Sequence, residues 1–214
     1  MNTAQTVAHS LLAIKAVFLR PNEPFTWASG IKSPIYTDNR LVLTAPAQRN
    51  LIEEALAERI RTHFPEAEVL MGTATAGIAH AALAADRLGL PMGYVRSSAK
   101  DHGRTNRIEG KLEPGAKVVV VEDLISTAGS VIDVVNALRD AGGHVCGIVA
   151  LFTYGMEAAS EALAASRTTL TTLTTFDDVI DAAVATGQIH ATDIPRLRAF
   201  RDNPRDESWM NEQE

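Results

Sequence analysis

The most informative segment of this chain reads Val118-Val119-Val120-Val121-Glu122-Asp123-Leu124-Ile125-Ser126-Thr127-Ala128-Gly129-Ser130. Four consecutive valines are typical of a strand that is buried on both faces, as in a parallel sheet. The small residues after the two acids are typical of a turn, and a helix is predicted over residues 129–141. A buried strand that leads into a crossover helix is the repeating unit of an α/β fold.

The same alternation continues on both sides of this segment. Strands are predicted at residues 68–71, 92–96, 117–121, 145–152 and 170–173, and helices at residues 1–20, 46–64, 76–88 and 129–141, with one more helix before the last strand and two after it. The pattern predicts a mostly parallel sheet flanked by helices. Ligands of such folds bind at the carboxyl ends of the strands, where the loops 72–77, 97–110 and 122–130 are expected.

Length and composition predict one domain over residues 1–214, to which residues 1–45 contribute a small cap. Hydrophobic residues make up 46% of the 214 residues, and the formal net charge is -6. An acidic chain is a poor candidate for binding nucleic acid or membrane surfaces. The single cysteine, Cys146, allows no intrachain disulfide, and no apolar stretch is long enough to span a bilayer. We therefore expect a cytoplasmic protein.

The turn after the valine strand has the makings of a phosphate site. A helix N-terminus offers free N–H groups to a phosphate, and Ser126, Thr127 and Ser130 can add hydroxyl donors. The carboxylates of Glu122 and Asp123 can accept hydrogen bonds from sugar hydroxyls. The segment has neither the Gly-Lys-Thr ending of a Walker A loop nor the glycine spacing of a dinucleotide fingerprint. An ordinary strand, turn and Ser/Thr helix cap would explain the hydroxyls, but not the adjacent carboxylates.

A second segment concentrates positive charge in this acidic chain. It reads Arg96-Ser97-Ser98-Ala99-Lys100-Asp101-His102-Gly103-Arg104-Thr105-Asn106-Arg107 and follows a predicted strand. A solvated surface loop is the simpler interpretation, since most charged loops are solvated. Cations on a closing loop, however, would stabilise the negative charge that develops on a leaving pyrophosphate.

The phosphate segment resembles the phosphoribosyl pyrophosphate (PRPP) motif of the type I phosphoribosyltransferases, which implies the fold of that family. The resemblance implies that Glu122 and Asp123 bind the ribose 2- and 3-hydroxyls. It assigns the rest of the PRPP contacts in this segment to Leu124, Ile125, Ser126, Thr127, Ala128, Gly129 and Ser130. Ala128 stands where a second glycine is common, and because alanine tolerates positive φ poorly, we expect a negative φ there.

Two further segments resemble the orotate phosphoribosyltransferases in particular. The Lys-Asp-His-Gly pattern at residues 100–103 is similar to their catalytic loop, which implies that Arg96, Lys100 and His102 bind pyrophosphate. That loop closes over the site of the partner subunit, so a homodimer with shared active sites is implied. The segment Phe25–Asp38 is similar to their N-terminal signature and implies a cap over the base site.

The same resemblance assigns the contacts of the base. Tyr36 would lie against the orotate ring, and the Ser126 hydroxyl would contact orotate. The chain departs from the enteric pattern of the family, because Ala28 and Ala76 replace lysines and Tyr154 replaces an arginine that faces the orotate carboxylate. Lys32 is a candidate substitute for these contacts.

The function implied is transfer of ribose 5-phosphate from PRPP to orotate, in pyrimidine biosynthesis, with Lys100, His102 and Asp123 as catalytic residues. Mg²⁺ would be the cofactor, held mainly by substrate and water, without a dedicated protein metal site. Two alternatives stay open. One is a non-enzymatic regulator that senses PRPP, although such a protein would usually carry a basic DNA-binding segment. The other is a transferase of the same family that uses another base.

Overall fold

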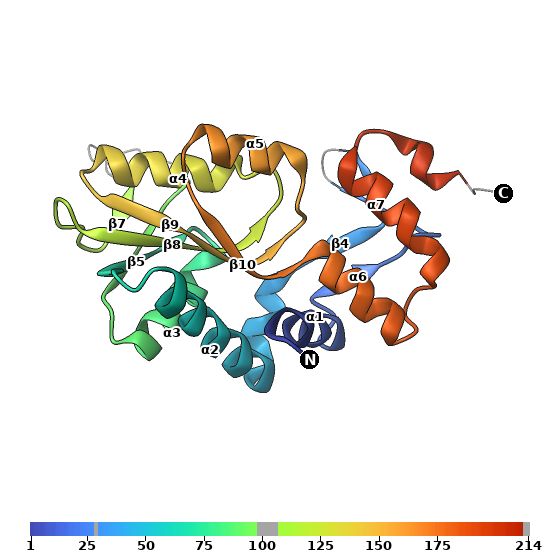
Figure 1. The fold of residues 1–214 in the computed structure, drawn as a ribbon, viewed down its shortest axis with the longest axis horizontal. Coiled ribbons are helices and arrows are strands. Elements are labelled where there is room, and N and C mark those ends of the chain that lie inside the picture. The colour runs from blue at the N-terminus through green and yellow to red at the C-terminus, as the bar shows by residue number, and fades with distance from the viewer. Residues whose placement is uncertain (28–29, 98–106, 212–214) are drawn as a thin grey trace.

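The structure is a computed structural model that describes residues 1–27, 30–97 and 107–211. A central sheet lies between two layers of helices, and a smaller lobe stands beside it (Figure 1). The N-terminal residues and the C-terminal helices meet in that smaller lobe. The predicted α/β class, with a mostly parallel sheet flanked by helices, is confirmed.

The central sheet has six strands in the order β10-β9-β8-β5-β6-β7. Its first five strands run parallel and β7 is antiparallel to β6. The strands are β5 (Val69–Thr73), β6 (Met92–Val95), β7 (Ile108–Glu109), β8 (Lys117–Ile125), β9 (His144–Thr153) and β10 (Leu170–Thr175). The four valines of β8 occupy the centre of this sheet, so they are covered on both faces, as their sequence predicts.

Two hydrophobic cores form on the two faces of the sheet. Val119 and Val121 face one core, which also contains residues of α1, α2, α3 and α6. Val118 and Val120 face the other, which contains residues of α4 and α5. The helices are α1 (Thr3–Ala13), α2 (Pro46–His63), α3 (Gly77–Leu88), α4 (Gly129–Asp140), α5 (Glu157–Ala165), α6 (Phe176–Ala185) and α7 (Ile194–Asp202).

Residues 1–45, for which the sequence predicts a small cap, contain α1, short strands and a 3₁₀ helix. The strands β1 (Val17–Leu19) and β4 (Ile35–Thr37) pair antiparallel, and β2 (Phe25–Thr26) pairs with β3 (Lys32–Ser33). The 3₁₀ helix η1 (Asn39–Thr44) leads into α2. Arg196 of α7 ties the C-terminal helix to this region, because it donates to the Pro21 carbonyl and to the Asn22 side chain.

Local sequence signals account for the end of α3 and the start of α6, whereas the helix predicted over residues 1–20 ends at Ala13 and is followed by β1. Gly89 ends α3 with the left-handed backbone that glycine adopts easily. Thr175 and Asp178 form a capping box at the start of α6. Within the described parts of the chain, no helix is both long and apolar enough to cross a membrane.

Candidate active site

The two acids of the phosphate segment lie within β8, which runs on to Ile125. The sequence predicts that this strand ends at Val121, and that boundary is wrong. Glu122 and Leu124 pair in register with Ala150 and Phe152 of β9, so the sheet continues past the acids. Both carboxylates are therefore carried on a rigid strand, and Asp123 lies close enough to Glu122 to help raise the pKa of that carboxyl.

Glu122 is buried near the carboxyl end of β8. Its Oε1 accepts a hydrogen bond from the Asp123 backbone N–H at 3.0 Å. Burial raises the pKa of Glu122 from 4.5 to about 8, although a hydrogen bond from Thr73 acts in the opposite direction. The Glu122 carboxyl is therefore largely protonated at neutral pH when no ligand is bound.

Asp123 is half-buried and connected to the cap. The side chain of Asn39 donates to the Asp123 carbonyl over 2.8 Å, which links the start of η1 to the end of β8. Asn39 is fully buried, and its Oδ1 has no hydrogen-bond partner within the described structure. No sequence pattern singles out Asn39, because its hydrogen bond is to a residue 84 positions away in the chain.

The N-terminus of α4 meets the end of β8 and is not closed by a side chain. Ala128 is its N-cap residue and makes no side-chain hydrogen bond to the helix. The first N–H groups of the helix are thus available to an anion, at the positive end of the helix dipole. Ser126, Thr127, Gly129 and Ser130 surround this end, and the last three are exposed.

Ala128 does not have the negative φ that we expect from its sequence. Its φ is 64° and its ψ is 0°, which is the left-handed conformation that glycine usually takes. This backbone costs an alanine roughly 1–2 kcal/mol. The Ala128 methyl group is buried in the core under α4, so burial offsets part of that cost.

A second helix N-terminus lies next to the first. β5 pairs with β8, and the loop after β5 leads into α3, whose N-cap Ala76 also makes no side-chain cap. A Cβ atom on Gly77 would lie 2.5 Å from the Val121 carbonyl oxygen, so only glycine allows α3 to begin so close to β8. The peptide between Ala74 and Thr75 in this loop is cis.

Arg96 follows β6 at the same edge of the sheet. Its Nη1 lies 3.7 Å from a carboxylate oxygen of Glu109 on β7. Its backbone N–H donates to the Arg107 carbonyl, so residues 96 and 107 extend the ladder between β6 and β7. Lys100 and His102 lie outside the described residues, as does Ala28.

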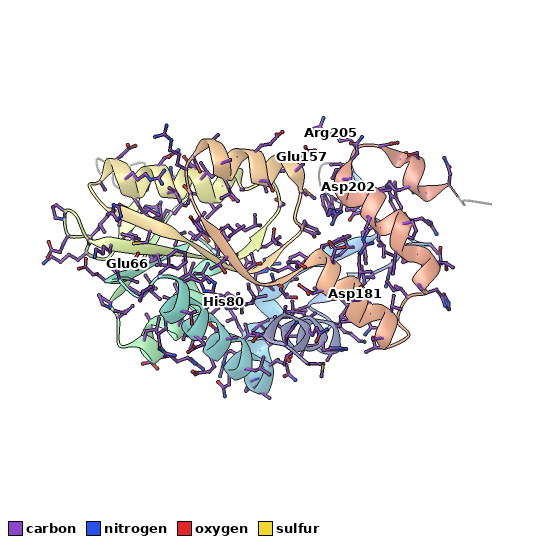
Figure 2. All side chains as sticks on the ribbon, in the orientation of Figure 1. Glu66, His80, Glu157, Asp181, Asp202 and Arg205 are labelled. Atoms are coloured by element: carbon purple, nitrogen blue, oxygen red, sulfur yellow. The ribbon has the colours of Figure 1, made fainter. Side chains whose placement is uncertain are left out.

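A cavity of about 460 Å³ separates the phosphate loop from the cap and the C-terminal helix. Ser126 and Thr127 line one side, and Trp27 and Ile31 belong to the cap. Glu157 at the start of α5 and Arg205 after α7 also line it, and Figure 2 labels both near the gap between these helices. This is a concave site with aromatic and polar lining, as small-molecule sites usually have.

Tyr154 sits beside this region but is packed away from solvent. Burial raises the pKa of its hydroxyl to about 12, and its oxygen lies 3.2 Å from the Thr37 hydroxyl of β4. Its ring contacts Trp27, Phe152 and Phe176. Tyr154 therefore joins the core to the cap through aromatic packing and carries no charge for a carboxylate.

The remaining base-site candidates lie on the cap. Tyr36 is exposed on β4 and contacts the ring of Phe25. Lys32 donates to the Thr26 hydroxyl and lines a separate hollow with Arg205, so it is not part of the cavity that contains Ser126. The cations that do line that cavity are Arg201 and Arg205, and Arg201 is already paired with Asp177 and Asp202.

Over residues 1–27, 30–97 and 107–211, no group of three or more His, Cys, Asp or Glu side chains is placed to hold a metal ion. The hard oxygen donors at the end of β8 are the two carboxylates of Glu122 and Asp123. They suit Mg²⁺ chemically, but two carboxylates are too few to coordinate the ion without oxygens from another source.

Comparisons with known proteins agree with this geometry. A family profile described as "Phosphoribosyl transferase domain" matches residues 41–186. The chain is 52% identical to an orotate phosphoribosyltransferase of Bacillus subtilis over 96% of its own length and 95% of that protein. It is 56% identical to the one of Bacillus pumilus, over 96% and 97%. The crystal structure of the orotate phosphoribosyltransferase of Aeropyrum pernix superposes with a TM-score of 0.74 at 31% identity, over 86% of this chain and 99% of that one.

Proposed function

The chain belongs to the phosphoribosyltransferase family and, within it, to the orotate phosphoribosyltransferases, and on that premise we propose how it works. It transfers the ribose 5-phosphate group of PRPP to orotate and releases pyrophosphate. The product is orotidine 5′-phosphate, so the enzyme acts in the de novo pyrimidine pathway to UMP. The observation that carries this proposal is the junction of β8 with α4, where two adjacent carboxylates lead directly to an uncapped helix N-terminus.

PRPP would bind with its ribose over the end of β8. Glu122 and Asp123 accept hydrogen bonds from the ribose 2- and 3-hydroxyls, and the 5-phosphate takes the free N–H groups of α4 and the hydroxyls around them. The carboxylate of Asp123 also stabilises the positive charge that develops on the ribose as the bond to pyrophosphate breaks. The rigid strand supports this role, since preorganised charges need no reorganisation during the reaction.

Arg96, Lys100 and His102 would hold the pyrophosphate end. They neutralise the negative charge that grows on the leaving group, and the N-terminus of α3 lies on the same edge of the sheet to assist. Residues 100–103 resemble the catalytic loop of the family, and this segment would close over the bound substrates. Closure has a chemical purpose, because water would otherwise capture the reactive ribose.

The base would occupy the cavity between the phosphate loop and the cap, where Ser126 can contact it. The family resemblance assigns the ring contact to Tyr36, which does not line this cavity. With tyrosine at position 154, the orotate carboxylate would point to Arg205, because Arg201 is paired with acids. The other charged residues that line the cavity are Glu157, Glu161 and Asp202. Orotate is already an anion at neutral pH, so no strong base is required to generate the nucleophile. Catalysis then depends on positioning and charge stabilisation.

We propose Mg²⁺ as the cofactor, which oxygens of PRPP and water would mainly hold. The carboxylate oxygens of Asp123 and Glu122 would be the protein atoms closest to the ion. When bound, the ion supplies positive charge that neutralises the pyrophosphate oxygens. Glu122 would contribute as a ligand only after it loses the proton that its burial retains.

We propose a homodimer in which the Lys100 loop of each subunit serves the site of its partner. The support is the Lys-Asp-His-Gly pattern of residues 100–103 and its separation in sequence from the ribose-binding acids. We also propose a cytoplasmic location, which the single cysteine supports.

The choice of base separates this proposal from another transferase of the family and from a PRPP-sensing regulator. In the presence of PRPP and Mg²⁺, the enzyme should consume orotate and leave uracil, hypoxanthine and adenine untouched. Uracil is the sharpest control, because it lacks only the carboxylate. Equal turnover of uracil and orotate would contradict a site that reads the carboxylate, and binding of PRPP without turnover of any base would indicate a regulator.

A further inference from the structure

Two arginines close the ends of the segment that carries the pyrophosphate-binding pattern. The backbone N–H of Arg96 donates to the Arg107 carbonyl over 2.9 Å. In return, Nε of Arg107 donates to the Arg96 carbonyl over 2.8 Å. The Arg107 side chain therefore binds the backbone of the very residue to which the family resemblance assigns a pyrophosphate contact.

The same guanidinium reaches the phosphate-binding helix. Nη2 of Arg107 donates to Oδ2 of Asp133 on α4 over 2.7 Å. Asp133 lies four residues after Gly129, so both residues are on the same face of the first turns of α4. Through one guanidinium, the backbone of Arg96 is thus tied to the helix turn that carries the phosphate loop.

Arg107 is well placed to hold these two parts in register. Its side chain is 21% exposed, whereas that of Asp133 is 60% exposed. Ile108, the next residue, is packed in the same core as Val131 and Val134 of α4, so the backbone beside Arg107 is also fixed against this helix. The ion pair is too exposed to contribute much to the free energy of unfolding, so stability alone does not account for its geometry.

We propose that Arg107 and Asp133 are positioning residues that set the distance between the site for the 5-phosphate of PRPP and the site for its pyrophosphate. This inference rests on the proposed function, because it takes Arg96 as a pyrophosphate ligand and the N-terminus of α4 as the 5-phosphate site. A substrate with an anionic group at each end requires that both sites be held at a fixed separation. Loss of the pair lets Arg96 move relative to α4 and weakens binding of PRPP, without touching the reacting atoms.

The test compares Asp133→Asn with Asp140→Asn. Both changes remove one negative charge from α4, and both residues line the same surface groove, but only Asp133 contacts Arg107. We expect Asp133→Asn to raise the Kd for PRPP, measured by calorimetry, by about 3- to 5-fold, the upper end of the range of an exposed ion pair. In steady-state kinetics the KM for PRPP should rise by a similar factor, while kcat and the KM for orotate change less than about 2-fold. Asp140→Asn should match the wild type.

Arg107→Gln and the double variant complete the experiment. If Asp133 acts through Arg107, the double variant should bind PRPP no more weakly than Arg107→Gln alone. Additive losses, or equal Kd values for Asp133→Asn and Asp140→Asn, would overturn the inference, as would a lower melting temperature of Asp133→Asn without any change in Kd. The calorimetry needs no base, so a wild type that binds PRPP but ignores orotate would refute the proposed function and still allow the inference to be judged.

Discussion

The buried carboxyl of Glu122 predicts an unusual dependence of stability on pH. Its pKa is raised from 4.5 to about 8 in the folded protein, mainly because burial disfavours the charged form. In the unfolded chain the same carboxyl returns to its ordinary pKa. Between these two values the folded state retains a proton that the unfolded state loses, so a rise in pH favours the unfolded state.

The size of the effect follows from the same two values. One proton taken up on folding lowers the free energy of unfolding by about 1.4 kcal/mol for each pH unit. Over the whole window from 4.5 to about 8, the upper limit is thus on the order of 5 kcal/mol. Below pH 4.5 the folded protein keeps this stability in full, and above about pH 8 the stability has been lost.

Glu122→Gln removes the pH-dependent contribution of Glu122 to the free energy of unfolding, because glutamine keeps the shape of the protonated side chain and does not titrate. We expect the variant to become more stable than the wild type as the pH rises from about 5 to about 8, with a difference that grows by up to about 1.4 kcal/mol per pH unit. Urea unfolding at fixed protein concentration measures it. Glu23→Gln, at an exposed position outside the sheet, is the control. Parallel pH profiles for Glu122→Gln and the wild type would show that the pKa of Glu122 is not raised in the folded protein.

Three further predictions concern Asp123, the buried pair between α2 and α3, and the proposed dimer. Asp123→Asn should lower kcat by a factor on the order of 100 or more, the scale seen when one preorganised electrostatic partner is lost; a near-normal kcat would mean that Asp123 only supports the fold. Glu53 and His80 are fully buried and lie 2.6 Å apart, so Glu53→Leu should cost about 3–5 kcal/mol of unfolding free energy, and adding His80→Phe should restore most of it; a double variant as unstable as the sum of both single changes would contradict this. Mixed Lys100→Ala and Asp123→Asn homodimers should recover ~25% of wild-type activity if sites are shared, because random pairing makes about half of the dimers hybrids with one intact site each; complete inactivity after proven subunit exchange would exclude shared sites.

Much of the architecture could be predicted from the sequence, because hydrophobic periodicity and glycine positions are local signals. The run Val118–Val121 indicates a strand buried on both faces, and it does lie at the centre of the sheet. The end of that strand was not predictable in the same way. Glu122 and Asp123 look like the start of a loop, but pairing with β9 keeps them in the sheet. Tertiary hydrogen bonds outweighed local propensity there.

The site shows the same limit. The acids and hydroxyls of the phosphate segment lie close together in the sequence, so their chemistry could be inferred from the sequence alone. The positive φ of Ala128 could not, because it depends on how the turn fits between β8 and α4. Contacts such as Asn39 with Asp123 and Arg107 with Asp133 join residues 84 and 26 positions apart, and no periodic pattern in one sequence encodes them.

The acids of β8 and the N-terminus of α4 are proposed to bind PRPP together for transfer to orotate. The most direct measurement follows orotate by absorbance and released pyrophosphate in the same reaction with PRPP and Mg²⁺. Wild-type enzyme should lose orotate and release pyrophosphate in equal amounts, and omission of either substrate should stop both. Pyrophosphate release that continues without orotate, or orotate that stays constant while PRPP is consumed, would contradict transfer of the ribose 5-phosphate group to orotate.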